Sequence, residues 1–138
     1  MSVVVPAYSE AESLPELVDG VRGACEEADL SFRLWIVDDG SRDHTWDVVQ
    51  SLHEADGRVL GLRFRRNYGK SAALAVGFER AQGRYVVTMD ADLQDDPAEI
   101  PALIEMLEED GHDLVSGWKK NRKDPLSKTI PSRFFNWI

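Results

Sequence analysis

Two aspartates separated by one residue, Asp90 and Asp92, are the side chains of this sequence best suited to metal chemistry. They directly follow the apolar run 85–89, which is β-branched and aromatic and therefore predicts a short buried strand. In extended backbone, residues two apart point to the same side, so both carboxylates can face one point, with the Gln94 amide oxygen nearby. Because like charges this close repel, a hard divalent cation that also carries phosphate oxygens is the natural occupant. An Asp-x-Asp is also common in acidic loops, and that alternative stays open on this segment alone.

Polar side chains also follow two other predicted strands. The segment 6–10 (Pro-Ala-Tyr-Ser-Glu) comes after the first strand, and the segment 38–41 (Asp-Asp-Gly-Ser) comes after the second. In a doubly wound sheet the carboxyl ends of parallel strands share one edge, where ligands bind. The ring of Tyr8 offers a stacking face for a base, and carboxylates suit base N–H groups or ribose hydroxyls. Each segment alone also fits an ordinary turn, but three such segments at one edge favour a nucleotide site.

A third feature, Gly69-Lys70 at a predicted helix start, resembles part of a phosphate-binding loop. The full Gly-x-x-x-x-Gly-Lys-Ser/Thr pattern is missing, because Arg65 stands where its first glycine would be. The sequence also lacks a dinucleotide-type Gly-x-Gly-x-x-Gly. We therefore expect the phosphate charge of a ligand to be met by a metal ion and by cations such as Lys70.

The elements that must position these residues alternate along the chain. The apolar patterns predict strands over 2–5, 32–37, 59–64, 85–89 and 113–117, and helices over 14–28, 45–55, 71–81, 97–109 and from about 126. Such alternation implies an α/β fold, with a mostly parallel sheet and helices on both of its faces. Asp96, followed by Pro97 and Glu99, is typical of a helix start, so we interpret it as a cap and exclude it from the metal ligands.

The length of 138 residues suits a single domain, and its net charge of −9 is unevenly distributed. Residues 118–138 hold six basic residues against one acid, which gives +5 and leaves −14 on residues 1–117. An acidic body argues against nucleic acid as a partner. The basic segment is also rich in aromatic residues, which suits a membrane headgroup region or a phosphorylated lipid; a solvated loop followed by a packed helix is the alternative. The single cysteine, Cys25, fits a packing role and a reducing compartment.

Four segments, 6–10, 37–41, 66–70 and 90–94, occur in an order that resembles family 2 glycosyltransferases of the GT-A fold. The similarity is greatest to the polyprenyl-phosphate branch, which includes dolichol-phosphate mannose synthases and bacterial undecaprenyl-phosphate sugar transferases. It covers nearly the whole chain. It implies a GT-A core over 1–117 and a basic, acceptor-side or membrane-proximal segment over 118–138, after which relatives continue with a further C-terminal part.

The resemblance implies inverting, metal-dependent transfer of a sugar from a UDP- or GDP-linked donor to a polyprenyl phosphate, at the cytoplasmic face of a membrane. Such an acceptor is mostly dianionic at neutral pH and needs no general base. The positions that match nucleotide-sugar contacts are Pro6, Ala7, Tyr8, Glu10, Asp38, Asp39, Lys70, Asp90 and Ala91. Those that match ligands of Mg²⁺ or Mn²⁺ are Asp90, Asp92 and Gln94, and those assigned to the acceptor phosphate are Arg122, Lys123 and Arg133. Asp92 and Arg133 are the implied catalytic residues, and Ser9 stands where many relatives carry Asn.

Two other classes of protein remain as alternatives. A receiver-type phospho-switch also uses an acid pair and a lysine after its last strand, for which Lys119 could serve. Against it, the acid pair of a receiver follows the first strand, whereas Asp38 and Asp39 follow the second. A non-catalytic binding domain of the same fold is the other alternative. The identity of the nucleotide and of the sugar stays open, as does a homo-oligomeric state.

Overall fold

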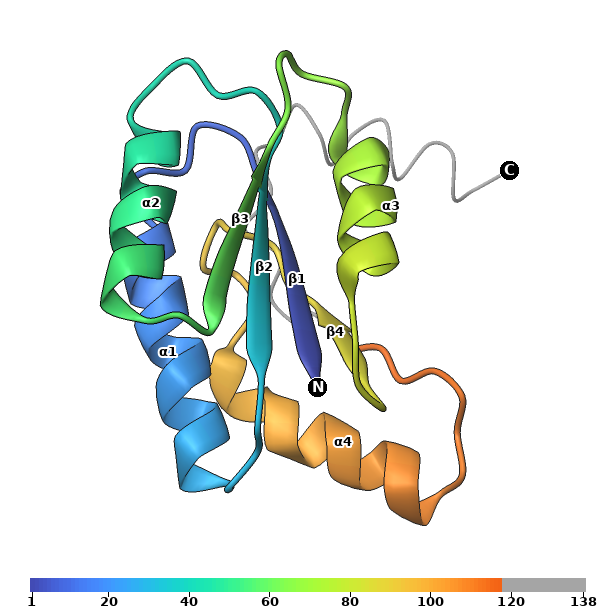
Figure 1. Cartoon of the computed structure of the whole chain (residues 1–138). Helices are drawn as coiled ribbons and strands as arrows, with labels where there is room; N and C mark the ends of the chain where they lie inside the picture. Colours follow the sequence, from blue (N-terminus) through green and yellow to red (C-terminus); the bar gives the residue numbers. More distant parts are fainter. Residues whose placement is uncertain (118–138) are drawn as a thin grey trace, which may run out of the picture.

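The structure, a computed structural model, describes residues 1–117 and shows the expected alternation of strands and helices (Figure 1). The strands are β1 (Ser2–Ala7), β2 (Arg33–Asp38), β3 (Val59–Arg63) and β4 (Val86–Thr88). The helices are α1 (Leu14–Glu27), α2 (Thr45–Ala55), α3 (Lys70–Arg80), the short 3₁₀ helix η1 (Pro97–Glu99) and α4 (Ile100–Glu109). The helix predicted from about residue 126 lies outside the described residues, as do Arg122, Lys123 and Arg133.

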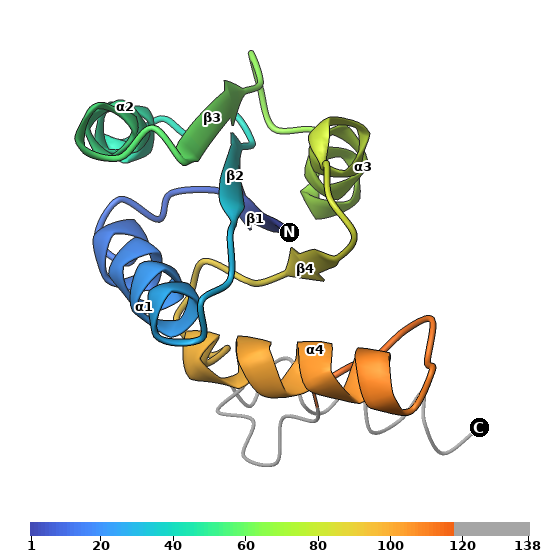
Figure 2. The same ribbon diagram turned by 60° about the horizontal axis from the view of Figure 1, so that its bottom comes forward.

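The four strands form a parallel sheet in the order β3-β2-β1-β4. The register pairs Ala7 with Asp38 and Asp38 with Arg63, so the last residues of three strands lie level with one another. Helices α1 and α2 lie on one side of the sheet and α3 on the other (Figure 2). The predicted α/β class with helices on both faces is confirmed. Its consequence is that the loops after the strands gather at one edge of the sheet.

The core forms because helix and strand place apolar side chains at matching periods. The buried residues of α1 are Leu14, Leu17, Val18, Val21 and Cys25, at the spacing of one helical face, and Cys25 has the predicted packing role. Helix α3 lies very close to β1, because Gly77 has no side chain: a Cβ there would stand 2.3 Å from Val4 Cγ1. Burial of each such aliphatic side chain stabilises the fold by about 1.5–3 kcal/mol.

Two strand predictions are wrong in part or in whole. The fourth strand is only three residues long and is not buried, because it lies at the sheet edge and pairs within the described residues with β1 alone; Val86 is 46% exposed. The strand predicted over 113–117 is absent, and these residues form no regular secondary structure. Leu114 is 85% exposed, so its side chain gains little of the burial that would hold such a strand on the sheet.

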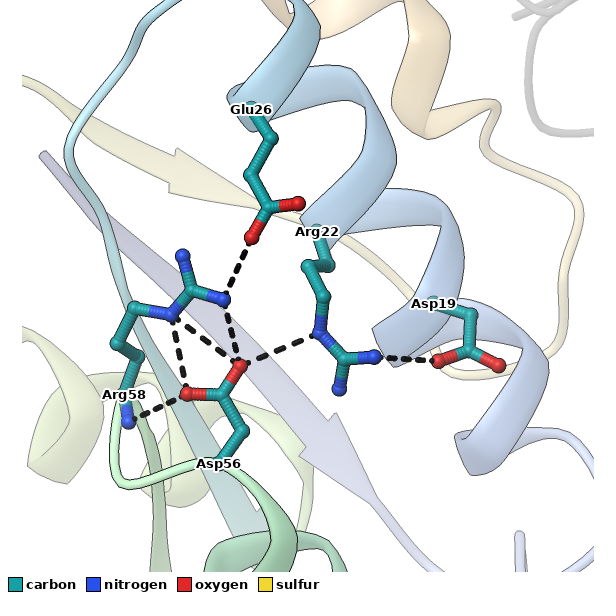
Figure 3. A network of polar contacts seen from close by, with 5 residues as sticks. All are labelled: Asp19, Arg22, Glu26, Asp56 and Arg58. Atoms are coloured by element: carbon teal, nitrogen blue, oxygen red, sulfur yellow. Dashed lines mark hydrogen bonds and ion pairs between the residues drawn. The ribbon is translucent and has the colours of Figure 1, made fainter.

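A network of charged side chains joins α1 to the loop between α2 and β3 (Figure 3). The carboxylate of Asp56 accepts hydrogen bonds from Arg58 at 2.8–3.2 Å and from Arg22 Nε at 3.2 Å, and Arg58 also donates to Glu26 at 2.7 Å. The hydrogen bonds from Arg58, followed by that from Arg22, hold the pKa of Asp56 well below its usual range. The network fixes the end of the sheet remote from the predicted site.

Candidate functional site at the carboxyl edge of the sheet

A pocket of about 270 Å³ opens at the carboxyl edge of the sheet, beyond β1 and β4. It draws on four separate segments of the chain, as predicted from their positions after strands. The lining residues are Pro6, Ala7, Tyr8, Glu10, Asp39, Asn67, Gly69, Lys70, Asp90, Ala91 and Asp92. Nine of the eleven residues predicted for nucleotide sugar or metal therefore surround one cavity. The two that do not line it are Asp38 and Gln94.

The backbone conformation that brings the two aspartates to this pocket is not the predicted one. The backbone is not extended between them, because β4 ends at Thr88 and a turn begins at Ala91, with Leu93 in the left-handed region at a φ of 60°. The turn is held by the backbone N–H of Asp90, which donates to the carboxylate of Asp95 at 2.9 Å. Both Asp90 and Asp92 nevertheless line the cavity, so the acid pair is brought together by a turn.

Gln94, which was predicted as a metal ligand, lies outside the pocket lining, and its role as a ligand stays a prediction. Its backbone N–H donates to Asp92 Oδ1 at 3.1 Å, which helps to fix the Asp92 carboxylate, but its side chain is exposed and does not line the pocket. The turn that replaces the extended backbone is the reason, since residues two apart then no longer share one side.

Lys70 begins α3 and forms an ion pair with Asp90 Oδ1. Its position depends on Asp39, whose two carboxylate oxygens accept the backbone N–H groups of Tyr68, at 2.7 Å, and Gly69, at 2.9 Å. Gly69 adopts a φ of 96° and a ψ of 157°, a conformation that is accessible essentially to glycine alone. Asp39 therefore holds the loop that carries Lys70 to the acidic pair, while it also lines the pocket.

Asp38 does not line the pocket, and its contacts lie at the ends of β2 and β3. It is fully buried, its Oδ1 accepts the Ser41 N–H at 2.9 Å, and its Oδ2 lies 3.4 Å from Arg63 Nε. Its carbonyl oxygen accepts the Phe64 N–H at 2.8 Å, which ties the end of β2 to the end of β3. These contacts give Asp38 a positioning role at the ends of β2 and β3, and its contact with a ligand stays a prediction.

Two hydroxyls that the sequence interpretation missed hold the loop after β1. Ser41 Oγ accepts the Ser9 N–H at 2.9 Å, and Thr45 Oγ1 accepts the Glu10 N–H at 2.9 Å. Thr45 Oγ1 donates in turn to Asp43 at 2.6 Å, and this bond lowers the pKa of Asp43. Ser9 itself is in the left-handed region at a φ of 58°, a conformation that Asn adopts more readily than Ser. Small hydroxyl residues just after a strand end are the signal that could have revealed these contacts.

The pocket residues fit a divalent metal with open coordination positions. Asp90 and Asp92 supply hard oxygen ligands, and Mg²⁺-type ions are commonly held by one or two carboxylates plus substrate phosphates. Within residues 1–117 no group of three or more His, Cys, Asp or Glu side chains is arranged to enclose a metal alone. Asp90 and Asp92 are therefore the residues of the pocket that could hold such a metal. Across the same residues, no helix has the length and apolarity that a bilayer crossing requires.

An open parallel α/β sheet with an acidic pocket at its carboxyl edge defines a protein of the doubly wound α/β class, in which ligands bind at this edge. A sequence model for "Glycosyl transferase family 2" matches residues 2–137, and the chain belongs to this family. Family membership rules out the receiver-type phospho-switch. The GT-A fold agrees with the solved structures that this chain resembles, described next.

Among curated relatives, the undecaprenyl-phosphate 4-deoxy-4-formamido-L-arabinose transferase of Pseudomonas syringae pv. syringae (strain B728a) is 44% identical over 137 residues. That alignment covers 99% of this chain and 40% of the relative. The transferase of the same name from Pseudomonas aeruginosa (strain LESB58) is 43% identical, with the same coverage. The chain therefore spans about two fifths of the length of the curated relatives it matches.

Among solved structures, the chain resembles the mannosyltransferase PcManGT from Pyrobaculum calidifontis, in complex with GDP-Man and Mn²⁺, with a TM-score of 0.66 and 26% identity. The match covers 78% of this chain and 32% of that one. TarS of S. aureus (residues 1–349) gives a TM-score of 0.67 at 22% identity, over 91% of this chain and 38% of that one. These similarities confirm the predicted fold.

Proposed function

We propose that this chain is the donor-binding part of an inverting, metal-dependent glycosyltransferase that moves a sugar from a nucleotide diphosphate to a polyprenyl phosphate. The observation that carries the proposal is the single pocket that collects Tyr8, Lys70, Asp90 and Asp92 from three loops. The names of the curated relatives support undecaprenyl phosphate as the acceptor class.

Different residues of the pocket are suited to different parts of a nucleotide sugar. Pro6 and Ala7, the last two residues of β1, line the pocket. The exposed ring of Tyr8 offers its face to a base. Glu10 offers carboxylate oxygens to base N–H groups or ribose hydroxyls. At the β4 end, Asp90 and Asp92 would hold Mg²⁺ or Mn²⁺, as the complex of PcManGT with GDP-Man and Mn²⁺ also suggests.

Charge balance explains why the reaction suits this site. The metal, when bound, acts as a Lewis acid and neutralises charge on the departing diphosphate. Lys70 places a further positive charge beside Asp90, in the pocket where the diphosphate would bind. Asp95 fixes the backbone of Asp90 and Gln94 fixes the Asp92 carboxylate, so both oxygen donors are oriented before a ligand arrives.

A phosphate acceptor also fits the residues available. A phosphate monoester is already a nucleophile at neutral pH, so no residue needs to remove a proton from it. Its negative charge needs cations, and we assign Arg122, Lys123 and Arg133 to that role from the sequence. The cytoplasmic face of a membrane is where such an acceptor would meet this basic segment.

Calorimetric titration with UDP- and GDP-linked sugars, with and without Mn²⁺, tests donor binding. We expect one nucleotide class to bind the wild-type chain only in the presence of metal, and the Asp92→Asn variant to lose at least tenfold in affinity. Asp96→Asn is the matched control, because Asp96 Oδ1 caps η1 by accepting the Ala98 N–H at 2.9 Å and does not line the pocket. Equal donor affinity in wild type and Asp92→Asn would refute the metal assignment.

Transfer of radiolabelled sugar to undecaprenyl phosphate tests the reaction itself. We expect Arg133→Ala to slow this transfer at least tenfold in the full-length enzyme while donor affinity stays unchanged. A loss of donor affinity would contradict the acceptor role of Arg133. A full-length enzyme that binds donor tightly and transfers nothing to any polyprenyl phosphate would favour the non-catalytic alternative.

A further inference from the structure

A second, larger pocket of about 450 Å³ lies beside the first, over the ends of β2 and β3. The two cavities share Tyr8 and Asn67, which form the wall between them. The lining residues of the second pocket are Tyr8, Gly40, Ser41, Arg42, Arg63, Phe64, Arg65, Arg66 and Asn67. None of the residues assigned to donor or metal, apart from Tyr8, lines this cavity.

The charge of this cavity is opposite to that of its neighbour. Four arginines and no acidic residue line it, although residues 1–117 carry a net charge of −14. The first pocket, by contrast, has four carboxylates and the single cation Lys70. An acidic cavity attracts a cation, and this basic cavity, in an otherwise acidic body, attracts an anion.

Most of the arginines of this pocket are also less neutralised than Arg22 and Arg58. Arg22 and Arg58 are held by carboxylates in the network of Figure 3. Among the described residues Arg42, Arg65 and Arg66 form no ion pair, and the Arg66 guanidinium instead lies 4.9 Å from the centre of the Tyr68 ring. Only Arg63 has an acidic neighbour, Asp38, at 3.4 Å. Three guanidinium groups thus keep their charge available at one cavity.

The two loops that carry these arginines pack closely on each other, so the arginines start from defined backbone positions around the cavity. Gly40 adopts a φ of 72°, and a Cβ at this position would lie 2.4 Å from the carbonyl carbon of Arg66. The loop after β2 therefore packs directly on the loop after β3. Ser41 is buried in this contact, and its hydroxyl, whose oxygen accepts the Ser9 N–H, keeps its own hydrogen to donate.

We propose that this second pocket is a phosphate-binding site separate from the donor site. Guanidinium groups present planar pairs of N–H donors that match phosphate oxygens, and several of them around one cavity suit a multiply charged phosphate group. The phosphate can belong to a small soluble molecule or to an anionic lipid headgroup, since both present the same oxygens. The proposal does not depend on the assignment of the first pocket.

Titration of the 138-residue chain with inorganic pyrophosphate, in buffer freed of divalent metal, tests the site. We expect wild type to bind, and the double variant Arg42→Gln/Arg65→Gln to lose at least tenfold in affinity. The matched control is Arg33→Gln/Arg80→Gln, which removes the same charge from exposed positions outside both pockets and should bind as wild type does. Thermal unfolding of all three proteins verifies that the variants are folded.

Sedimentation with phospholipid vesicles separates the two sources of phosphate. Phosphatidylglycerol vesicles that carry down wild type and the control, but not Arg42→Gln/Arg65→Gln, would assign the site to a lipid headgroup. Pyrophosphate binding without vesicle binding would assign it to a soluble phosphate. Failure of both ligands to bind wild type, or equal losses in the two double variants, would overturn the proposal.

The Asp92→Asn variant keeps this test distinct from that of the donor site. Pyrophosphate binding that persists in Asp92→Asn and is lost in Arg42→Gln/Arg65→Gln supports a separate site. Binding that requires Mn²⁺ and disappears in Asp92→Asn would place the phosphate in the first pocket and refute the second.

Discussion

At the scale of single residues, Asp39 shows how one carboxylate serves structure and site together. Its two oxygens accept two successive backbone N–H groups, and the same side chain forms part of the pocket wall. The sequence suggested a ligand contact for Asp39. The structure adds that it anchors the loop in front of α3, and with it the position of Lys70.

This double role makes Asp39→Asn informative. The amide has one oxygen and one NH₂ group, so one backbone N–H of Tyr68 or Gly69 would face a donor in place of an acceptor. We expect the free energy of unfolding in urea to fall by about 1–3 kcal/mol. Asp47→Asn, at an exposed position on α2, is the control and should change little. Equal stabilities of the two variants would contradict the anchoring role.

At the scale of elements, the close packing of two loops sets the edge of the sheet. Gly40, after β2, has both a left-handed conformation and a backbone neighbour, Arg66, where a side chain would begin. Both pockets are built on these loops. A residue other than glycine at position 40 would have to move one loop away from the other.

Gly40→Ala is therefore expected to destabilise the fold. The left-handed conformation costs an L-residue about 1–2 kcal/mol, and the overlap with the Arg66 backbone adds about 1–3 kcal/mol. Chemical denaturation should show the sum of these losses, and pyrophosphate affinity should fall as well. Gly57→Ala is the control, because a Cβ there meets nothing within 4 Å and its φ is not positive. A near-neutral Gly40→Ala would show that the loops can separate freely.

The same scale shows what could be predicted from sequence and why. The alternation of elements and the gathering of loops at one edge followed from the apolar periods, since these record local burial directly. The edge position of β4 could not be predicted in this way. The run 85–89 is mostly apolar, and that pattern does not show whether a strand has neighbours on both sides or lies at the edge. The turn at Asp90–Asp92 was missed for a related reason: the side-chain pattern does not reveal that Leu93 adopts a positive φ.

At the scale of the whole molecule, charge is sorted into separate regions. The first pocket is acidic, the second is basic, and the network around Asp56 ties the opposite end of the sheet together. Two of the predicted ligand residues, Asp38 and Asp39, accept backbone N–H groups of the loops that form the two pockets. Their long-range partners, such as Phe64 and Tyr68, could not be found from sequence spacing.

The network of Figure 3 predicts how stability depends on pH. The pKa of Asp56 is lowered, chiefly by Arg58, so the folded state binds a proton at this carboxyl less readily than the unfolded chain does. The stabilisation is complete above about pH 4, the ordinary Asp range, and is lost as the pH falls below it. We expect Asp56→Asn to cost about 1–2 kcal/mol at pH 7, a modest value because the network lies partly at the surface.

Urea unfolding of wild type and Asp56→Asn between pH 7 and pH 3 checks this expectation. The stability difference between the two proteins should be constant from pH 7 to about pH 5 and shrink toward pH 3. Asp19→Asn is the control, because Asp19 lies at the exposed end of the network and accepts only one bond from Arg22. A stability difference that does not vary with pH would contradict the role given to the Asp56 carboxylate.

The central claim is that Asp90 and Asp92 together hold a divalent metal against the diphosphate of a nucleotide sugar. A crystal structure of the chain with Mn²⁺ and the bound nucleotide sugar, with anomalous scattering to locate the metal, tests it most directly. We predict one manganese peak within about 2.5 Å of an oxygen of each aspartate and of the diphosphate. A nucleotide sugar bound away from both aspartates, with no metal between them, would contradict the claim.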